Sequence, residues 1–173
     1  MPEQHPEILI VGSGAMGALF GAILFENGRN VVLYDTDHEH IQAIQKNGLQ
    51  IEGFGGNRKV PIPATTDLSQ LESAEILLFQ CKAHGTRNAA QAVKHLIRDH
   101  SVCISFQNGL GNEEVISEEL GHQYVLGGLT AMAAVLLGPG TLRDFSRVPS
   151  HIGEMQGKTS ARTETIASRL SDA

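Results

Sequence analysis

The chain of 173 residues is long enough for one domain with a hydrophobic core. It carries 19 acidic against 13 basic residues and lacks Trp, so it offers neither a basic surface nor an aromatic stacking platform for nucleic acid. The longest apolar run, residues 125–137, is too short to span a bilayer, and no charged leader with an apolar stretch opens the chain. Cys81 and Cys103 sit in apolar runs without a disulfide framework, which indicates a reducing compartment. We therefore expect a cytoplasmic, globular protein with neither nucleic-acid nor membrane partners.

A glycine-rich turn near the start of the chain is the strongest motif. The apolar run at residues 8–11 is typical of a buried parallel strand, and the apolar stretch up to Phe25 is typical of a helix. Between them the spacing is G-x-G-x-x-G, in which the glycines allow a tight turn, close approach of a pyrophosphate, and close packing of helix on strand. The sequence therefore predicts a dinucleotide-binding loop whose residues are Gly12, Ser13, Gly14, Ala15, Met16 and Gly17.

An acidic residue stands at the distance that such a loop requires. Asp35 ends a second apolar strand, residues 30–35, and lies 18 residues after Gly17. A carboxylate there accepts hydrogen bonds from the adenosine ribose hydroxyls and favours NAD over NADP. The alternative is a plain helix N-cap, because Asp35 and Asp37 both precede a helical pattern over about residues 36–46. The acidic and histidine side chains of this segment fan around the helix start, so we expect no metal site there.

The remaining patterns predict an α/β fold, namely a Rossmann-type, mostly parallel, doubly wound sheet with antiparallel strands near the C-terminal end. Residues 49–52 and 59–63 flank a Gly-rich turn and predict a hairpin at the edge of this sheet, followed by a polar connection over residues 64–73. Further strands are expected at 75–80, 101–106, 124–135, 141–145 and 150–153. Further helices are expected at about 86–98, 113–120 and 159–170.

Two polar residues follow strands of this sheet, at the rim where ligands bind in open parallel sheets. Lys82 follows the strand at 75–80 and could bind a ribose, a phosphate or a substrate carboxylate. Asn108 follows the strand at 101–106 and offers both a donor and an acceptor to a ribose or a substrate. The alternatives are a solvated lysine and a simple Asn-Gly turn, and His84 in the same loop is more often incidental than an acid or base.

Six motifs follow one another along the chain: GSGAMG, CKAH, SFQNGLGNEE, GGLTAMAA, GPGTLRDF and IGE. In this order they resemble the 2-dehydropantoate 2-reductase (ketopantoate reductase) family over nearly the whole chain. Such enzymes are NAD(P)-dependent oxidoreductases acting on CH–OH groups, which use NADPH to reduce ketopantoate to pantoate in pantothenate biosynthesis. The resemblance implies that the glycine loop holds the pyrophosphate, that Lys82 and Asn108 lie at the nicotinamide end beside the substrate, and that Ala134 lines the cofactor groove.

The chain departs from the family pattern in two respects. Members often carry an arginine after the second strand that clamps the 2′-phosphate of NADPH, whereas this chain has Asp35-Thr36. The cofactor is therefore NADP or NAD, and Asp35 favours NAD. The family's general-acid lysine belongs to a helical C-terminal domain, which these 173 residues lack. The resemblance thus implies that residues 1–173 form the NAD(P)-binding Rossmann domain, inactive alone because the general-acid lysine is expected in the other domain.

Two other functions remain open from the sequence. One is a related dehydrogenase for another 2-keto or 2-hydroxy acid, and the other is a non-catalytic dinucleotide-binding or sensing module completed by a partner chain. Met16, Leu110 and residues 129–137 are expected near the rim, where they would form an apolar face for a homo-oligomer or a partner chain. Alternatively, residues 129–137 form an internal strand already covered by helices.

Overall fold

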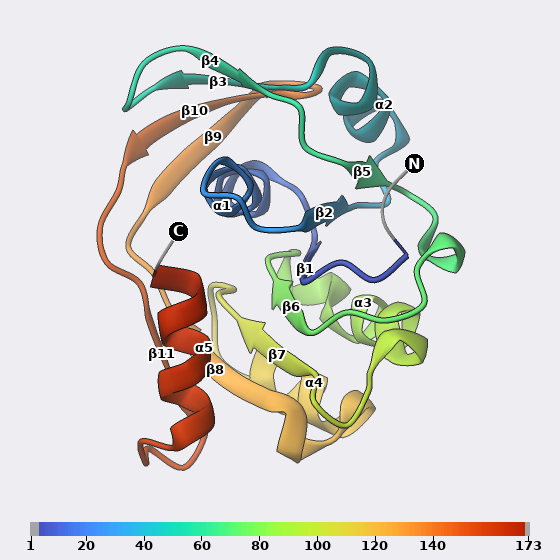
Figure 1. Cartoon of the computed structure of the whole chain (residues 1–173), viewed down its shortest axis with the longest axis vertical. Helices are drawn as coiled ribbons and strands as arrows, with labels where there is room; N and C mark the ends of the chain where they lie inside the picture. Colours follow the sequence, from blue (N-terminus) through green and yellow to red (C-terminus); the bar gives the residue numbers. More distant parts are fainter. Residues whose placement is uncertain (1–3, 172–173) are drawn as a thin grey trace.

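The computed structural model describes residues 4–171 and shows two sheets (Figure 1). The larger sheet within these residues has the strand order β11-β8-β7-β6-β1-β2-β5. Its strands are β1 (Ile8–Val11), β2 (Val31–Tyr34), β5 (Ala64–Thr65), β6 (Ile76–Phe79), β7 (Val102–Ser105), β8 (Val125–Leu129) and β11 (His151–Glu154). The smaller sheet, with the order β4-β3-β10-β9, consists of β3 (Leu49–Gly53), β4 (Arg58–Val60), β9 (Ala133–Gly138) and β10 (Thr141–Ser146).

Helices cover both faces of the larger sheet, which confirms the predicted Rossmann-type fold. The helices are α1 (Ala15–Glu26), α2 (His38–Asn47), α3 (Thr86–Val93), α4 (Asn112–Leu120) and α5 (Ala161–Ser171). One core joins the sheet to α1, α2 and α5, and a second core on the opposite face joins it to α3 and α4 (Figure 1). Burial of the sheet on both faces explains why β1, β6 and β7 are apolar at nearly every position.

Pairing in the larger sheet is parallel from β5 to β8. Ile8 of β1 pairs with Val31 of β2 on one side and with Ile76 of β6 on the other. β11 runs antiparallel to β8, as predicted for the C-terminal end of the sheet. The edge strand next to β2 is β5, which the sequence predicted only as part of a polar connection. With two residues, β5 is too short to show a strand pattern in the sequence.

The predicted hairpin forms, with Leu49 of β3 opposite Val60 of β4, but its place in the fold was predicted wrongly. It lies in the smaller sheet rather than at the edge of the larger one, because β10 pairs in parallel with β3 and antiparallel with β9. This sheet packs over α1 and buries Leu142 completely. The hairpin therefore lies in the smaller sheet because this sheet covers α1.

The single strand predicted over residues 124–135 is divided between the two sheets. β8 ends at Leu129 and β9 begins at Ala133, with a turn between them in which the Thr130 hydroxyl accepts from the Met132 amide at 3.2 Å. Three consecutive side chains of β9 stay 40–45% exposed, namely Val135, Leu136 and Leu137. This exposure rules out the alternative of an internal strand covered on both faces.

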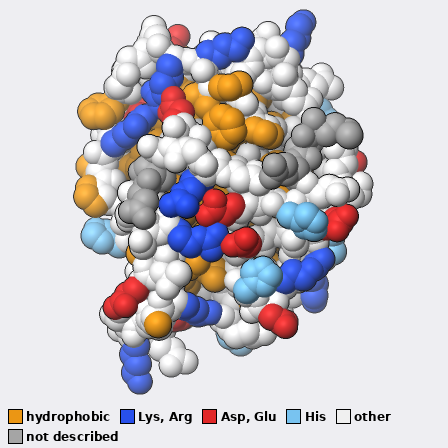
Figure 2. Space-filling model, viewed as in Figure 1, with side chains coloured by type: hydrophobic (Ala, Val, Ile, Leu, Met, Phe, Trp, Pro, Cys, Tyr) orange, Lys and Arg blue, Asp and Glu red, His pale blue; other side chains and the backbone are white. Residues whose placement is uncertain are grey.

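The C-terminal helix α5 is tied to the start of the first strand. Arg169 Nη2 lies 2.8 Å from a carboxylate oxygen of Glu7 and 2.8 Å from one of Glu75. Figure 2 shows acidic and basic side chains next to one another near the middle of the face of the molecule that is drawn there. Between residues 4 and 171, every helix is too short or too polar to cross a membrane.

Candidate functional site

The glycine loop makes the turn from β1 into α1 where only glycine fits. Gly12 has φ +96°, and a Cβ there would lie 2.4 Å from the backbone nitrogen of Cys81. A Cβ at Gly17 would lie 2.0 Å from the carbonyl oxygen of Gly12. At Gly14 a Cβ would meet no heavy atom within 4 Å. The loop is thus tightly packed at its two ends and open at its centre, the arrangement that lets a ligand approach the backbone.

The first turn of α1 is suited to an anion. The helix starts at Ala15 after Gly14, its first turn carries no acidic residue, and no side chain of the described residues caps it. Gly14, Ala15 and Met16 are partly exposed. The amides at a helix N-terminus lack intrahelical acceptors and carry the positive end of the helix dipole, so this turn can hold a phosphate group.

Asp35 is fixed against the glycine loop. One carboxylate oxygen accepts from the Ser13 amide at 2.7 Å, and the other accepts from the Asp37 amide at 3.1 Å. The N-cap of α2 is Asp37, which accepts from the His40 amide at 3.0 Å. The plain N-cap reading of Asp35 is therefore wrong, and its carboxylate instead joins the end of β2 to the turn after β1.

A cavity of about 420 Å³ opens at the carboxyl ends of β1, β2 and β6. Its walls include Gly12, Gly14, Asp35, Lys82 and His84. Lys82 is exposed and precedes the short 3₁₀ helix η2 (Ala83–Gly85), which leads into α3. The structure therefore brings one cation, one carboxylate and the open centre of the glycine loop around a single cavity.

Asn108 and Ala134 lie outside the walls of this cavity. Asn108 is exposed in the loop after β7, and its carbonyl accepts from Asn112 Nδ2 at 3.2 Å. Ala134 lies in β9 of the smaller sheet, partly buried against the core that includes α1. Of the pair expected at the nicotinamide end, only Lys82 borders the cavity beside Asp35.

Other residues around the cavity were not predicted from the sequence. Cys81 lines it next to Lys82, and burial raises the pKa of the Cys81 thiol, so this side chain stays protonated at neutral pH. Asn88 lines it four residues after His84, about one helical turn further on, and this spacing is the signal that could have identified it. No group of three His, Cys, Asp or Glu side chains among residues 4–171 is arranged to hold a metal ion.

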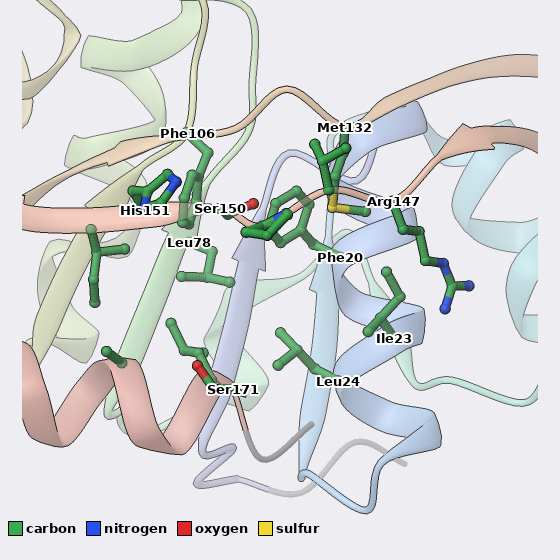
Figure 3. A pocket seen from close by; sticks show the side chains of 15 residues that line it. Phe20, Ile23, Leu24, Leu78, Phe106, Met132, Arg147, Ser150, His151 and Ser171 are labelled. Atoms are coloured by element: carbon green, nitrogen blue, oxygen red, sulfur yellow. The ribbon is translucent and has the colours of Figure 1, made fainter.

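A second cavity of about 530 Å³ lies between α1 and α5 and shares no residue with the first (Figure 3). Its walls are mostly apolar, and the rings of Phe20 and Phe106 meet there with centroids 5.0 Å apart. Arg147 stands at one side with its guanidinium directed away from the other labelled side chains (Figure 3). Although larger, this cavity lacks the uncapped helix start, the lysine and the carboxylate of the first, which is therefore the better candidate site.

Comparison with known proteins identifies the family. The family model described as Ketopantoate reductase PanE/ApbA matches residues 8–157. A 2-dehydropantoate 2-reductase of Pyrococcus horikoshii is 39% identical over 147 residues, which cover 85% of this chain and 47% of that protein. One of Halobacterium salinarum is 29% identical over 165 residues, which cover 95% and 54%. The chain thus spans about half the length of the curated relatives it matches.

Solved structures agree with this family and with the share of the relatives' length that the chain covers. The ternary structure of D-mandelate dehydrogenase with NADH and anilino(oxo)acetate matches with a TM-score of 0.85 and 27% identity, covering 95% of this chain and 54% of that one. The PanE/ApbA family ketopantoate reductase from Ralstonia eutropha JMP134 matches with a TM-score of 0.84 and 28% identity, covering 95% and 53%. The chain belongs to the ketopantoate reductase PanE/ApbA family, of which it represents the N-terminal, Rossmann-type part.

Proposed function

We propose that this chain is the dinucleotide-binding part of a 2-dehydropantoate 2-reductase-like oxidoreductase, which reduces ketopantoate to pantoate with NAD(P)H. The observation that carries the proposal is the glycine loop, open at Gly14 and braced by the Asp35 carboxylate, at the mouth of a cavity that Lys82 borders. Family membership supports the reaction class. The substrate class, a small 2-keto acid, comes from the relatives' names.

The residues fit a dinucleotide. A Cβ at Gly14 would fill space that is open in this loop, and the uncapped first turn of α1 presents amides to a pyrophosphate. Asp35 would accept from ribose hydroxyls, and Lys82 would neutralise a phosphate or a carboxylate. Asn108 and Ala134 are assigned to the nicotinamide end on the family resemblance. When bound, the reduced cofactor supplies a hydride to the keto carbon, and a proton completes the new hydroxyl group.

We propose NADH as the preferred cofactor. Both oxygens of Asp35 are held by backbone amides, so the negative charge stays beside the ribose position and would repel a 2′-phosphate. Two arginines that could compensate are engaged with carboxylates, because Arg29 pairs with Glu7 at 3.5 Å and Arg58 pairs with Glu26 at 2.7 Å. Titration with NADH and with NADPH, followed by nicotinamide fluorescence, tests this. Equal or tighter binding of NADPH would contradict the preference.

The isolated chain is expected to bind the dinucleotide without turning over ketopantoate. Loss of a general acid alone lowers a rate by about 10² to 10⁴, and loss of substrate contacts lowers it further. The test is the oxidation of NADH and NADPH by purified residues 1–173 with ketopantoate, alongside the binding titration. Steady-state turnover without a second chain would refute the expectation, and a failure to bind either cofactor would refute the proposed function.

A second substrate is favoured by one comparison. The structure of D-mandelate dehydrogenase with NADH and anilino(oxo)acetate has the same fold over 95% of this chain at 27% identity. This comparison supports a reductase for another 2-keto acid as the second candidate, and a non-catalytic module completed by a partner chain is the third. The first two candidates are separated by measuring NADH oxidation with a panel of 2-keto acids. This measurement requires the chain together with a partner chain that restores turnover.

A further inference from the structure

The loops that follow β6 and β7 are joined by three side chains to which the proposed function gives no role. Gln107 Nε2 donates to the Cys81 carbonyl at 2.7 Å and to the Thr86 hydroxyl at 2.8 Å. The Thr86 hydroxyl donates to Asn112 Oδ1 at 3.1 Å, and Asn112 Nδ2 donates to the Asn108 carbonyl at 3.2 Å. One chain of hydrogen bonds thus connects the residue before Lys82 with Asn108.

Each hydrogen bond in this network has a defined donor and a defined acceptor. The single proton of the Thr86 hydroxyl is used toward Asn112, and one of its lone pairs is used toward Gln107, so the hydroxyl fixes the orientation of both amides. Thr86 is 1% exposed and Asn112 is 4% exposed, so water cannot replace a lost partner without rearrangement. The position also matters, because Thr86 is the first residue of α3 and Asn112 is the first residue of α4.

The loop that this chain holds packs directly on the glycine turn. The Cys81 amide donates to the Val11 carbonyl at 3.2 Å, and the Cys81 nitrogen is the atom that a Cβ at Gly12 would meet. Cys81 and Lys82 both line the cavity, so a shift of this segment changes the cavity wall beside the glycine loop.

We propose that Gln107, Thr86 and Asn112 are positioning residues, which hold the loop carrying Lys82 and the loop carrying Asn108 as one unit. The effect of this hydrogen-bond network on cofactor affinity rests on the proposed function, whereas the coupling of the two loops does not. The three residues are absent from the cavity wall, and their bonds to the Cys81 and Asn108 carbonyls hold the backbone of the two loops.

The same two helices offer a matched control. On the exposed surface Arg87 of α3 pairs with Glu118 of α4 at 2.7 Å and also contacts Glu119, and Gln91 donates to Glu119 at 3.2 Å. This link joins α3 to α4 without touching either loop. An Arg87→Ala variant therefore removes a contact between the helices and leaves the loop network in place.

The test uses Thr86→Val, which removes the hydroxyl at nearly constant shape, and Thr86→Ser, which keeps it. Thermal unfolding, amide hydrogen exchange of peptides covering residues 81–85 and 107–112, and NADH titration are measured for each variant. Thr86→Val should raise exchange in both loops together and weaken NADH binding about tenfold, the effect of losing a buried hydrogen-bond chain. Thr86→Ser should stay within about threefold of the original affinity, and Arg87→Ala should change neither exchange nor affinity.

A graded variant keeps the test decisive if Thr86→Val does not fold. Asn112→Asp retains the acceptor for Thr86 and loses the donor to Asn108, so faster exchange is expected in residues 107–112 alone. Unchanged loop exchange in both variants, or a lower melting temperature with the same loop exchange, would overturn the proposal. If the original chain fails to bind NADH, the proposed function falls, and the exchange data still decide whether the loops are coupled.

Discussion

The glycine-loop rim and the smaller sheet are built on opposite principles, although both pack against α1. At the rim the backbone itself is held, since the Gly12 amide donates to the Tyr34 carbonyl at 2.9 Å and the Ser13 amide donates to Asp35. In the smaller sheet the β9–β10 ladder tolerates two register shifts, and three successive side chains from Val135 to Leu137 face solvent in part. The comparison shows that a ligand site constrains main-chain atoms, whereas a covering layer needs only its inward side chains to fit.

The largest expected effect comes from breaking the rim at Gly17. In Gly17→Ala the new Cβ would meet the Gly12 carbonyl at 2.0 Å, so the loop must shift. We expect NADH binding to be lost and the free energy of unfolding to fall by about 2–4 kcal/mol. The control is Gly56→Ala in the hairpin turn of the smaller sheet, where φ is +85° and a Cβ meets nothing within 4 Å. That change should cost about 1 kcal/mol and leave binding intact; equal losses in both variants would erase the distinction between the regions.

The second prediction sharpens the electrostatic side of the rim. Asp35→Asn keeps an oxygen for the Ser13 amide and removes the negative charge. We expect the ratio of NADPH to NADH affinity to rise about tenfold, since the repulsion of a 2′-phosphate is lost while the loop stays braced. Both affinities are measured by nicotinamide fluorescence. An unchanged ratio would mean that the carboxylate does not face the cofactor.

The third prediction concerns the antiparallel end of the larger sheet, where a side-chain ion pair adds to the backbone pairing of β11 with β8. Arg162 donates to Glu154 at 2.8 Å, and this bond above all lowers the pKa of Glu154 from its usual 4.5 to about 2. A lowered pKa means that the folded state gains stability above pH 4.5 and loses it as the pH falls toward 2. The loss should be on the order of 1–2 kcal/mol after allowance for solvent screening. The free energy of unfolding, measured with urea at several pH values, should depend less on pH in Glu154→Gln than in the original chain. The same pH dependence in both would contradict this prediction.

The smallest expected effect is self-association through the exposed apolar side chains. Leu110 is fully exposed and Leu129 is 70% exposed, in addition to the partly exposed residues of β9. Figure 2 shows hydrophobic side chains in separate groups on one face, so we expect weak association that grows with concentration. Light scattering over a concentration series, with and without NADH, measures it. A monomer at every concentration would show that these residues form no interface between copies.

Local sequence patterns predicted the glycine turn and its parallel strands well and the smaller sheet poorly. The apolar run at residues 8–11 and the glycine spacing are local patterns, and Asp35 follows at a fixed distance, so the turn and the parallel strands could be predicted from them. The pairing of β3 with β10 joins segments far apart in the chain, and periodicity carries no information about such partners. The Thr86 hydroxyl was missed for the same reason, because its partners come from another helix and loop.

The contact of Arg169 with Glu7 has a consequence for how the chain folds. These residues are 162 positions apart, so their pairing closes almost the whole described chain into one loop. Closing such a loop costs entropy that only an already assembled sheet can offset. We therefore expect this contact to form only after the larger sheet has assembled, and long-range contacts of this kind to slow folding relative to the formation of single helices.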